Sequence, residues 1–176
     1  GAGALGAATS GNNCTAVGKN ALGTTVDGAA NTAVGVGALA ADCGNNNTAV
    51  GKGALDVFTG SDSTAIGFEA ADAATDALRI TAIGYAALGV AVSQDDCTAV
   101  GYAALDAATS GNENTAVGSY ALSATVDGTR NTALGYGAAN ADCADDNTAL
   151  GWSALNNCTD SDNVAIGSGA MRYSTS

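Results

Sequence analysis

The sequence predicts an all-β fold, a parallel β-solenoid (β-roll) of about ten coils with 16 or 17 residues in each coil. Two short phrases that return at a fixed period and a composition poor in large side chains lead to this prediction. Aromatic residues make up 5% of the chain, which has 25 glycines and no proline, so the core must be thin. A unit this short has no room for a helix pair or a propeller blade, but it matches one turn of a solenoid.

The first phrase, Thr-Ala-aliphatic-Gly, marks one short strand in each unit. Its first three residues alternate between the two faces of an extended chain, and the glycine after them favours a turn. The phrase begins at Thr15, Thr32, Thr48, Thr64, Thr81, Thr98, Thr115, Thr132 and Thr148, and Val164 opens a tenth copy.

The second phrase follows each of these glycines at a constant distance. An alanine stands three residues after the glycine and is usually followed by leucine, which predicts a second short stretch in the coil before a loop of variable length. The copies with leucine are Ala21-Leu22, Ala38-Leu39, Ala54-Leu55, Ala87-Leu88, Ala104-Leu105, Ala121-Leu122 and Ala154-Leu155.

A longer repeat is superimposed on the short one. The segment 107–112 repeats the segment 7–12, and the segment 141–143 repeats the segment 41–43, in both cases 100 residues later. Because six units span this distance, a block of six coils has been duplicated. We therefore expect residues 1–176 to form a single repeat array that is a window of a longer fibre.

The two faces of the predicted strands carry different rows of side chains. Threonine and the aliphatic residue share one face, and the aliphatic position holds only Val, Ile or Leu. We therefore expect this face to fill the interior of the coil, and the replacement of threonine by Val164 fits a packed position. The alternative is an outward-facing threonine row, which would suggest binding to ice.

The alanine face is expected to contact other chains. A solvent-facing position in so loose a repeat would drift to Ser, Lys or Asp, yet every unit keeps alanine, which indicates close approach by chains arranged around a symmetry axis. The expected inter-chain packing residues are Ala16, Ala33, Ala49, Ala65, Ala82, Ala99, Ala116, Ala133, Ala149 and Ala165.

Asparagine precedes six of the ten predicted strands and predicts a stacked ladder of amides. Units of the type N-T-A-[IV]-G-Y-x-A-L, with loops such as Thr109-Ser110-Gly111-Asn112, resemble tandem repeats of phage tail fibres and bacterial surface proteins. They are also similar to the YadA-like head repeats of trimeric autotransporter adhesins. The resemblance covers essentially the whole chain and implies a parallel β-roll that assembles as a homotrimer.

Charge and composition disfavour several classes of function. Asp and Glu outnumber Lys and Arg by 17 to 5, and the net charge of −12 would be repelled by nucleic acid and by anionic membranes. No apolar run approaches the roughly 20 residues that span a bilayer. The chain has no histidine, and Lys19 and Lys52 are most simply solvated turn residues. We therefore expect no catalysis, no nucleic-acid partner and no insertion into a membrane.

Aromatic residues recur at the turn after the repeat glycine. Stacked coils would align them along one edge of the rod, as a packing stripe or as a platform for a cell-surface glycan. These candidate residues are Phe68, Tyr85, Tyr102, Tyr120, Tyr136 and Trp152.

The loops are rich in acidic and amide residues, including Asp95-Asp96 and Asp145-Asp146. Oxygen-rich loops suit calcium, a hard cation that takes six to eight oxygen ligands, but no EF-hand pattern is present. Turn formation and solubility explain the same residues, so no cofactor is expected. Cys143 and Cys158 occupy nearly equivalent loop positions in adjacent coils and are a candidate disulfide.

These observations predict a structural and adhesive rod, a segment of an extracellular surface fibre or phage tail fibre, located outside the cell, on its surface or on a virion. The partner is expected to be the chain itself, with a glycan as a further candidate. The alternative is an extracellular filament or matrix protein that polymerises by end-to-end stacking of coils. An ice-binding solenoid is a third reading.

Overall fold

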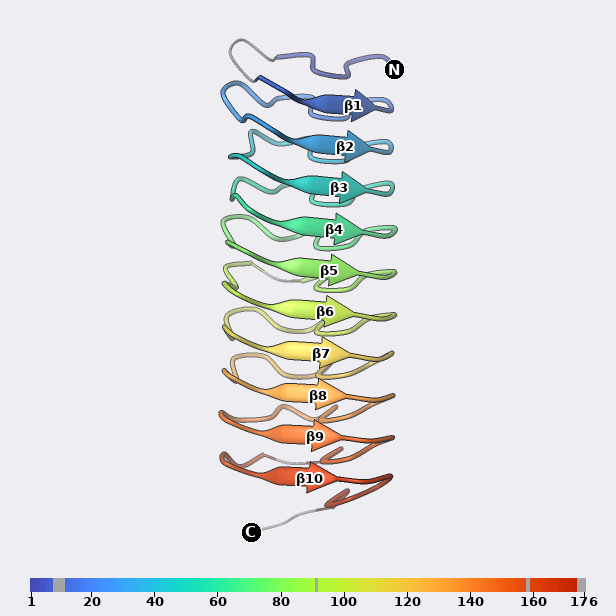
Figure 1. Cartoon of the computed structure of the whole chain (residues 1–176), viewed down its shortest axis with the longest axis vertical. Helices are drawn as coiled ribbons and strands as arrows, with labels where there is room; N and C mark the ends of the chain where they lie inside the picture. The colour runs from blue at the N-terminus through green and yellow to red at the C-terminus, as the bar shows by residue number, and fades with distance from the viewer. Residues whose placement is uncertain (8–11, 91, 158, 174–176) are drawn as a thin grey trace.

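The computed structural model describes residues 1–7, 12–90, 92–157 and 159–173, and Figure 1 shows them wound into a stack of coils with one strand in each. The strands within the described residues are β1 (Thr15–Val17), β2 (Thr32–Val34), β3 (Thr48–Val50), β4 (Thr64–Ile66), β5 (Thr81–Ile83), β6 (Thr98–Val100), β7 (Thr115–Val117), β8 (Thr132–Leu134), β9 (Thr148–Leu150) and β10 (Val164–Ile166).

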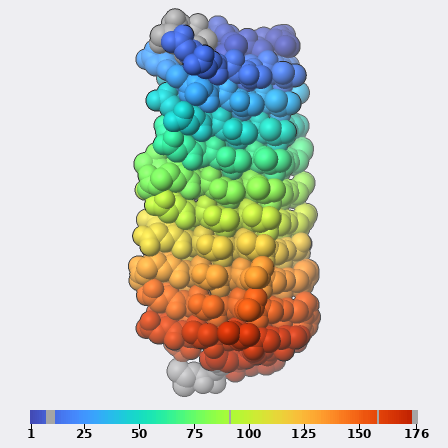
Figure 2. All heavy atoms as spheres, in the orientation of Figure 1, coloured from blue at the N-terminus to red at the C-terminus, as the bar shows by residue number. Residues whose placement is uncertain are grey.

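The strands form one parallel sheet in the order of the sequence, from β1 to β10. Equivalent residues pair throughout, so that Ala99 lies beside Ala82 on one side and Ala116 on the other. Figure 2 shows the coils as layers of an elongated rod. The predicted fold class, an all-β parallel solenoid with about 17 residues per turn, is confirmed.

The predicted second stretch of each coil forms turns and not a second strand. Leu39 and Leu55 have φ near +50°, in the left-handed region that L-residues other than Gly, Asn and Asp rarely adopt. The backbone still links neighbouring coils, because the Leu39 N–H donates to the Ala54 carbonyl at 3.0 Å. The Gly53 N–H donates to the Val36 carbonyl at the same distance. Hydrogen bonds therefore join neighbouring coils outside the strands as well as within the sheet.

The glycine that ends each strand is required by the close approach of the next coil. Gly35 has a φ of +143°, and a Cβ added there would collide with the carbonyl oxygen of Gly51. The same collision recurs from coil to coil, for example between Gly101 and Gly118. Only a residue without a side chain fits this corner, which explains why all ten units keep it.

The core lies between the strand wall and the Ala-Leu wall, and it reverses the expected orientation of the strands. The alanine at the strand centre is fully buried from Ala33 to Ala133, whereas Val34 and Ile83 on the same strands are each 36% exposed. The interior is filled by the leucines of the second phrase, including Leu105 and Leu122, which have no exposed surface. The prediction that the threonine and aliphatic face fills the interior is therefore wrong.

The predicted asparagine ladder is present and buried. The Asn131 side chain donates from Nδ2 to the Ala144 carbonyl at 2.8 Å and accepts from the Asn147 N–H at 2.9 Å. Asn31 makes the equivalent bonds to the Gly44 carbonyl and to the Asn47 N–H. Most of these bonds join an amide side chain to the backbone of the next coil, so the ladder satisfies backbone groups that no strand pairs.

Candidate functional site

The most extensive candidate surface is the strand face, by which we mean the outward side chains of β1 to β10. It consists of the threonine row and the aliphatic row beside it. The threonines are half-buried or exposed, and aliphatic residues in the middle of the rod, such as Ile66, remain 41% exposed. Figure 1 shows the strands stacked in one direction, so both rows run along the length of the rod.

The strand face carries no charge, although the chain has a net charge of −12. The outward positions of the ten strands hold only Thr, Val, Ile and Leu. A row of exposed or half-buried aliphatic side chains along ten coils is unusual for a monomeric soluble protein, in which contiguous apolar patches rarely exceed a few hundred Å². This face is therefore the candidate interaction surface.

The alanines that we expected to contact other chains lie inside their own coil. Ala49, Ala82 and Ala116 are completely buried within a single chain, and only Ala16, in the first complete coil, is half-buried. A side chain with no exposed surface has nothing to offer a neighbouring chain, so this prediction is wrong. The uniform choice of alanine reflects the narrow interior, where the Ala-Leu wall leaves room for a methyl group only.

The aromatic row forms a continuous ladder of rings. Phe68 stacks on Tyr85 with centroids 5.3 Å apart, and Tyr85 stacks on Tyr102 at 5.2 Å. The Lys52 ammonium covers Phe68 at 4.9 Å from the ring centroid. Both faces of Tyr85 are thus occupied by protein. A pyranose that stacks on a face of Tyr85 would have to displace a neighbour, which favours the packing interpretation for this ring over the glycan one.

Edge-to-face contacts extend the row, from Tyr102 to Tyr120 at 5.2 Å and from Tyr120 to Tyr136 at 6.0 Å. Trp152 packs against the Arg172 guanidinium, which lies 5.1 Å from a ring centroid. The six rings keep between 38% and 54% of their surface exposed. Whether they contact a ligand at their edges remains a prediction.

The acidic and amide side chains of the loops hold neighbouring coils together. Asp95 accepts from the Leu78 N–H at 2.8 Å, and Asp145 accepts from the Thr129 N–H at 2.8 Å. Asn45 accepts from the Ala29 N–H in the same way. Among the described residues no group of three or more Cys, Asp or Glu is arranged to hold a metal ion. The described geometry gives these loops a structural role.

Two arginines form bidentate ion pairs with the next coil. Arg79 bonds Asp96 at 2.6 and 2.8 Å, and Arg130 bonds Asp146 at 2.7 Å through both nitrogens. The hydrogen bonds and the positive charge lower the pKa of both carboxyl groups. Both pairs are well exposed, so each adds little to stability.

The four cysteines within the described residues occupy buried or half-buried positions in the coils. Cys97 takes the place of an asparagine in the ladder, with its Sγ 3.3 Å from the Gly111 carbonyl, and burial raises the pKa of its thiol to about 11. Burial also raises the pKa of Cys43, so neither thiol is prepared for nucleophilic chemistry. Cys143 is buried, but Cys158 lies outside the described residues, and the proposed disulfide between them remains a prediction.

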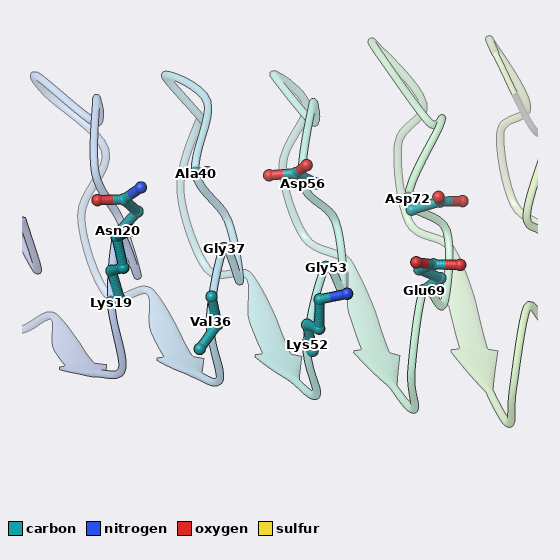
Figure 3. A pocket seen from close by; sticks show the side chains of 10 residues that line it. All are labelled: Lys19, Asn20, Val36, Gly37, Ala40, Lys52, Gly53, Asp56, Glu69 and Asp72. Carbon is teal, nitrogen blue, oxygen red and sulfur yellow. The ribbon is translucent and has the colours of Figure 1, made fainter.

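A hollow on the turn edge brings together residues that the sequence did not connect. Its volume is about 330 Å³, and it spans the first four strands at the edge where the chain turns away from them. Figure 3 shows Lys19 and Lys52 on its strand side and Asp56, Glu69 and Asp72 further along the coils. The feature of the sequence that corresponds to this hollow is a pair of glycines, Gly37 and Gly53, at equivalent positions of adjacent units.

No helix in the described part of the chain has the length and apolar character needed to cross a membrane. No family model matches the chain, and neither the curated proteins nor the solved structures give a significant match. The chain is therefore characterised by its own geometry: a regular repeat of about 17 residues that forms a β-solenoid with an uncharged strand face.

Proposed function

We propose that the protein is a structural rod segment of an extracellular fibre, in which further copies of the same chain cover the strand face. The observation that carries this proposal is the uncharged strand face, whose aliphatic side chain is exposed in most coils and half-buried in the coils of β3, β6 and β7. A solenoid suits a structural role because each coil stacks on the next and extends the rod without changing its cross-section.

A second copy of the chain is the occupant that the charges favour. Two chains with a charge of −12 repel each other, but the carboxylates lie outside the strand face, so contact there buries no like-charged pair. Identical spacing of the rows lets two copies pack in register. Three copies around an axis would form a closed homotrimer, in agreement with the resemblance to trimeric fibres.

The size of the face is sufficient for specific association. Ten strands spaced by about 4.8 Å, each about 10 Å wide, give a footprint of roughly 500 Å² per chain. A pair of such faces buries roughly 1,000 Å², which is near the lower limit for a biological interface. The aromatic row follows the aliphatic row along the chain and enlarges the apolar area.

The test is the mass of the chain in solution, measured by light scattering. The wild type is expected at three times the chain mass of 16.7 kDa. The double variant Val100→Asp and Val117→Asp places carboxylates on the strand face and should give monomers with an unchanged circular dichroism spectrum. The matched control is Val57→Asp, because Val57 is exposed in a loop, and it should remain trimeric. A monomeric wild type contradicts the proposal, and long polymers would favour the end-to-end filament.

Ice binding is a second candidate, because the threonine row faces outward. Nine threonines in register form a regular, uncharged array of hydroxyl and methyl groups next to the aliphatic row. The test is thermal hysteresis of the wild type and of Thr98→Lys, in which a charged side chain interrupts the array. Hysteresis that the wild type shows and Thr98→Lys loses supports this candidate. The two functions compete for the same face, so a stable trimer without hysteresis argues against ice binding.

A further inference from the structure

The hollow on the turn edge has two walls of opposite charge. One wall is formed by Lys19 and Lys52, which follow the strand-ending glycines, with Val36 between them (Figure 3). The other wall carries Asp56 and Asp72, which lie further along their coils, and Glu69 closes the end beside them. Both lysines of the chain therefore line one groove opposite three carboxylates.

The groove is open where two adjacent coils both have glycine at a row that holds a side chain in several other coils. Gly37 and Gly53 have φ near +70°, but the equivalent residues Glu69, Ala86 and Ser153 adopt φ between +48° and +52° with side chains present. The backbone therefore does not demand glycine at this row. A Cβ at Gly53 would meet no atom closer than 3.4 Å, so the space is free. The groove thus combines the free space at these two adjacent glycines with the charged side chains around them.

The charges of the two walls do not neutralise each other. Within the described residues the ion pairs are made by Arg79 and Arg130, and neither lysine takes part in one. The Lys52 ammonium instead rests on the Phe68 ring. An anionic ligand would meet the repulsion of a chain with a charge of −12, and a cation would leave the lysine wall without a partner. A ligand with both charges matches both walls.

We propose that this groove binds a zwitterionic ligand of about monosaccharide size, with an ammonium group at the acidic wall and an anionic group at the lysine wall. The volume of about 330 Å³ lies at the lower end of the range for small-molecule sites, roughly 300 to 1,000 Å³. Carboxylates are strong acceptors for an ammonium group, and lysines are donors to phosphate or carboxylate. An amino sugar that carries an acidic group and a linear amino acid share this chemistry.

The environment of Asp72 agrees with such a ligand. Partial burial raises the pKa of this carboxyl group, and the nearby Glu69 carboxylate raises it further. The acidic wall thus holds negative charge that the protein itself leaves without full compensation. An ammonium group bound there would supply the missing positive charge.

The experiment is titration calorimetry with a set of probes that separates charge from size. Glucosamine 6-phosphate and 6-aminohexanoate carry both charges, whereas N-acetylglucosamine 6-phosphate and hexylamine each lack one of the two. Binding of either zwitterion should be at least tenfold tighter than binding of its singly charged analogue. The two zwitterions distinguish a saccharide from a linear amino acid as the source of the chemistry. Equal binding of zwitterions and singly charged analogues, or no binding of either zwitterion, overturns the proposal.

A matched pair of variants places the binding in the groove. Gly53→Gln fills the groove with an uncharged side chain and should weaken binding of the preferred zwitterion at least tenfold. Gly137→Gln adds the same side chain at the same row, outside the groove, and should leave binding unchanged. Unchanged binding in Gly53→Gln would refute the assignment. The mass by light scattering should be the same in both variants, because the groove is separate from the strand face, so this proposal and self-association fail independently.

Discussion

The coils around β4 to β6 and the coils around β7 to β10 share one fold but differ in the row that precedes the strands. In the second region this row is an unbroken run of asparagines, from Asn114 to Asn163, and each one from Asn131 onward accepts or donates across coils. In the first region the row reads Ser63, Ile80 and Cys97. Ser63 still accepts from the Ile80 N–H at 3.2 Å, but isoleucine offers no acceptor to the coil that follows.

The interruption is accompanied by a buried amide without partners. Gln94 has no exposed surface, and within the described residues neither its Oε1 nor its Nε2 is hydrogen-bonded. Most of its counterparts in other coils are glycine or alanine. A buried amide without partners is costly, so the middle of the rod should be its least stable part. We therefore expect stability to vary from coil to coil although the backbone pairing is uniform.

The largest effect is expected from Asn131→Ala, which breaks the intact ladder. The Asn147 N–H loses its buried acceptor, and the bond to the Ala144 carbonyl is lost, so the free energy of unfolding should fall by about 2 to 4 kcal/mol. Denaturant titration measures this loss. Asn45→Ala is the control, since its bond to Ala29 is exposed and water can replace it, and it should cost less than about 1 kcal/mol. Equal costs would mean that burial of the ladder is irrelevant.

The next effect is a gain of stability from Gln94→Met in the middle of the rod. Methionine is flexible and similar in length, and it removes two polar atoms that have no partners, so the free energy of unfolding should rise by about 1 to 2 kcal/mol. The midpoint of denaturant unfolding reports the gain. A loss of stability would indicate that the amide of Gln94 is satisfied in solution, and the contrast between the two regions would then disappear.

A smaller gain is expected from Ala30→Asn, which acts on the backbone and not on either ladder region. Ala30 has a φ of +58°, and the equivalent residues Asn13 and Asn46 adopt the same conformation with a side chain that tolerates it. Relief of this strain should raise the free energy of unfolding by about 0.5 to 1 kcal/mol. Thermal unfolding monitored by circular dichroism is adequate for the comparison. Ala30→Val, which is β-branched, should be destabilising in the same assay.

The smallest effect is a dependence of stability on pH. Its sign differs between the partly buried aspartates and the aspartates that pair with arginine. The pKa values of Asp72 and Asp106 are raised by burial, so the folded state binds their protons more tightly, and stability should rise as the pH falls from 7 toward about 4. The pKa values of Asp96 and Asp146 are lowered by arginine, so their contribution is present above about pH 4 and is lost below it. Thermal melts between pH 2.5 and 7 should therefore show a maximum near pH 4 to 5. A steady decline from pH 7 would contradict these signs.

The period and the alternation of the sequence were enough to place every strand. Each predicted Thr-Ala-aliphatic segment is a strand in the described structure, from Thr15–Val17 to Val164–Ile166, and the asparagine row hydrogen-bonds between coils as predicted. Short strands whose register is fixed by identical neighbours leave little freedom in position. The spacing of the repeated glycines and asparagines was therefore sufficient to predict the fold.

The orientation of the strands could not be read from the alternation alone. The aliphatic position holds only Val, Ile or Leu, and this restriction indicates an interior for the face that it shares with threonine. The deciding feature is the Ala-Leu wall, which approaches so closely that Leu88 and Leu122 fill the space and the strand contributes only a methyl group. These leucines adopt a left-handed backbone conformation because of the packing around them. A glycine at these positions would have indicated a positive φ from the sequence, but leucine does not. The groove was missed because its glycines matter only when the coils are aligned.

The in-register pairing of one strand per coil makes the length of the rod adjustable in fixed steps. Because each residue lies beside its own counterpart in the next coil, one added unit moves every row by about 4.8 Å along the axis and keeps all rows aligned. The duplicated block of six units corresponds to roughly 29 Å of length. Duplication or loss of whole units therefore changes the length of the rod in fixed increments, while the types of residue on each of its surfaces stay the same.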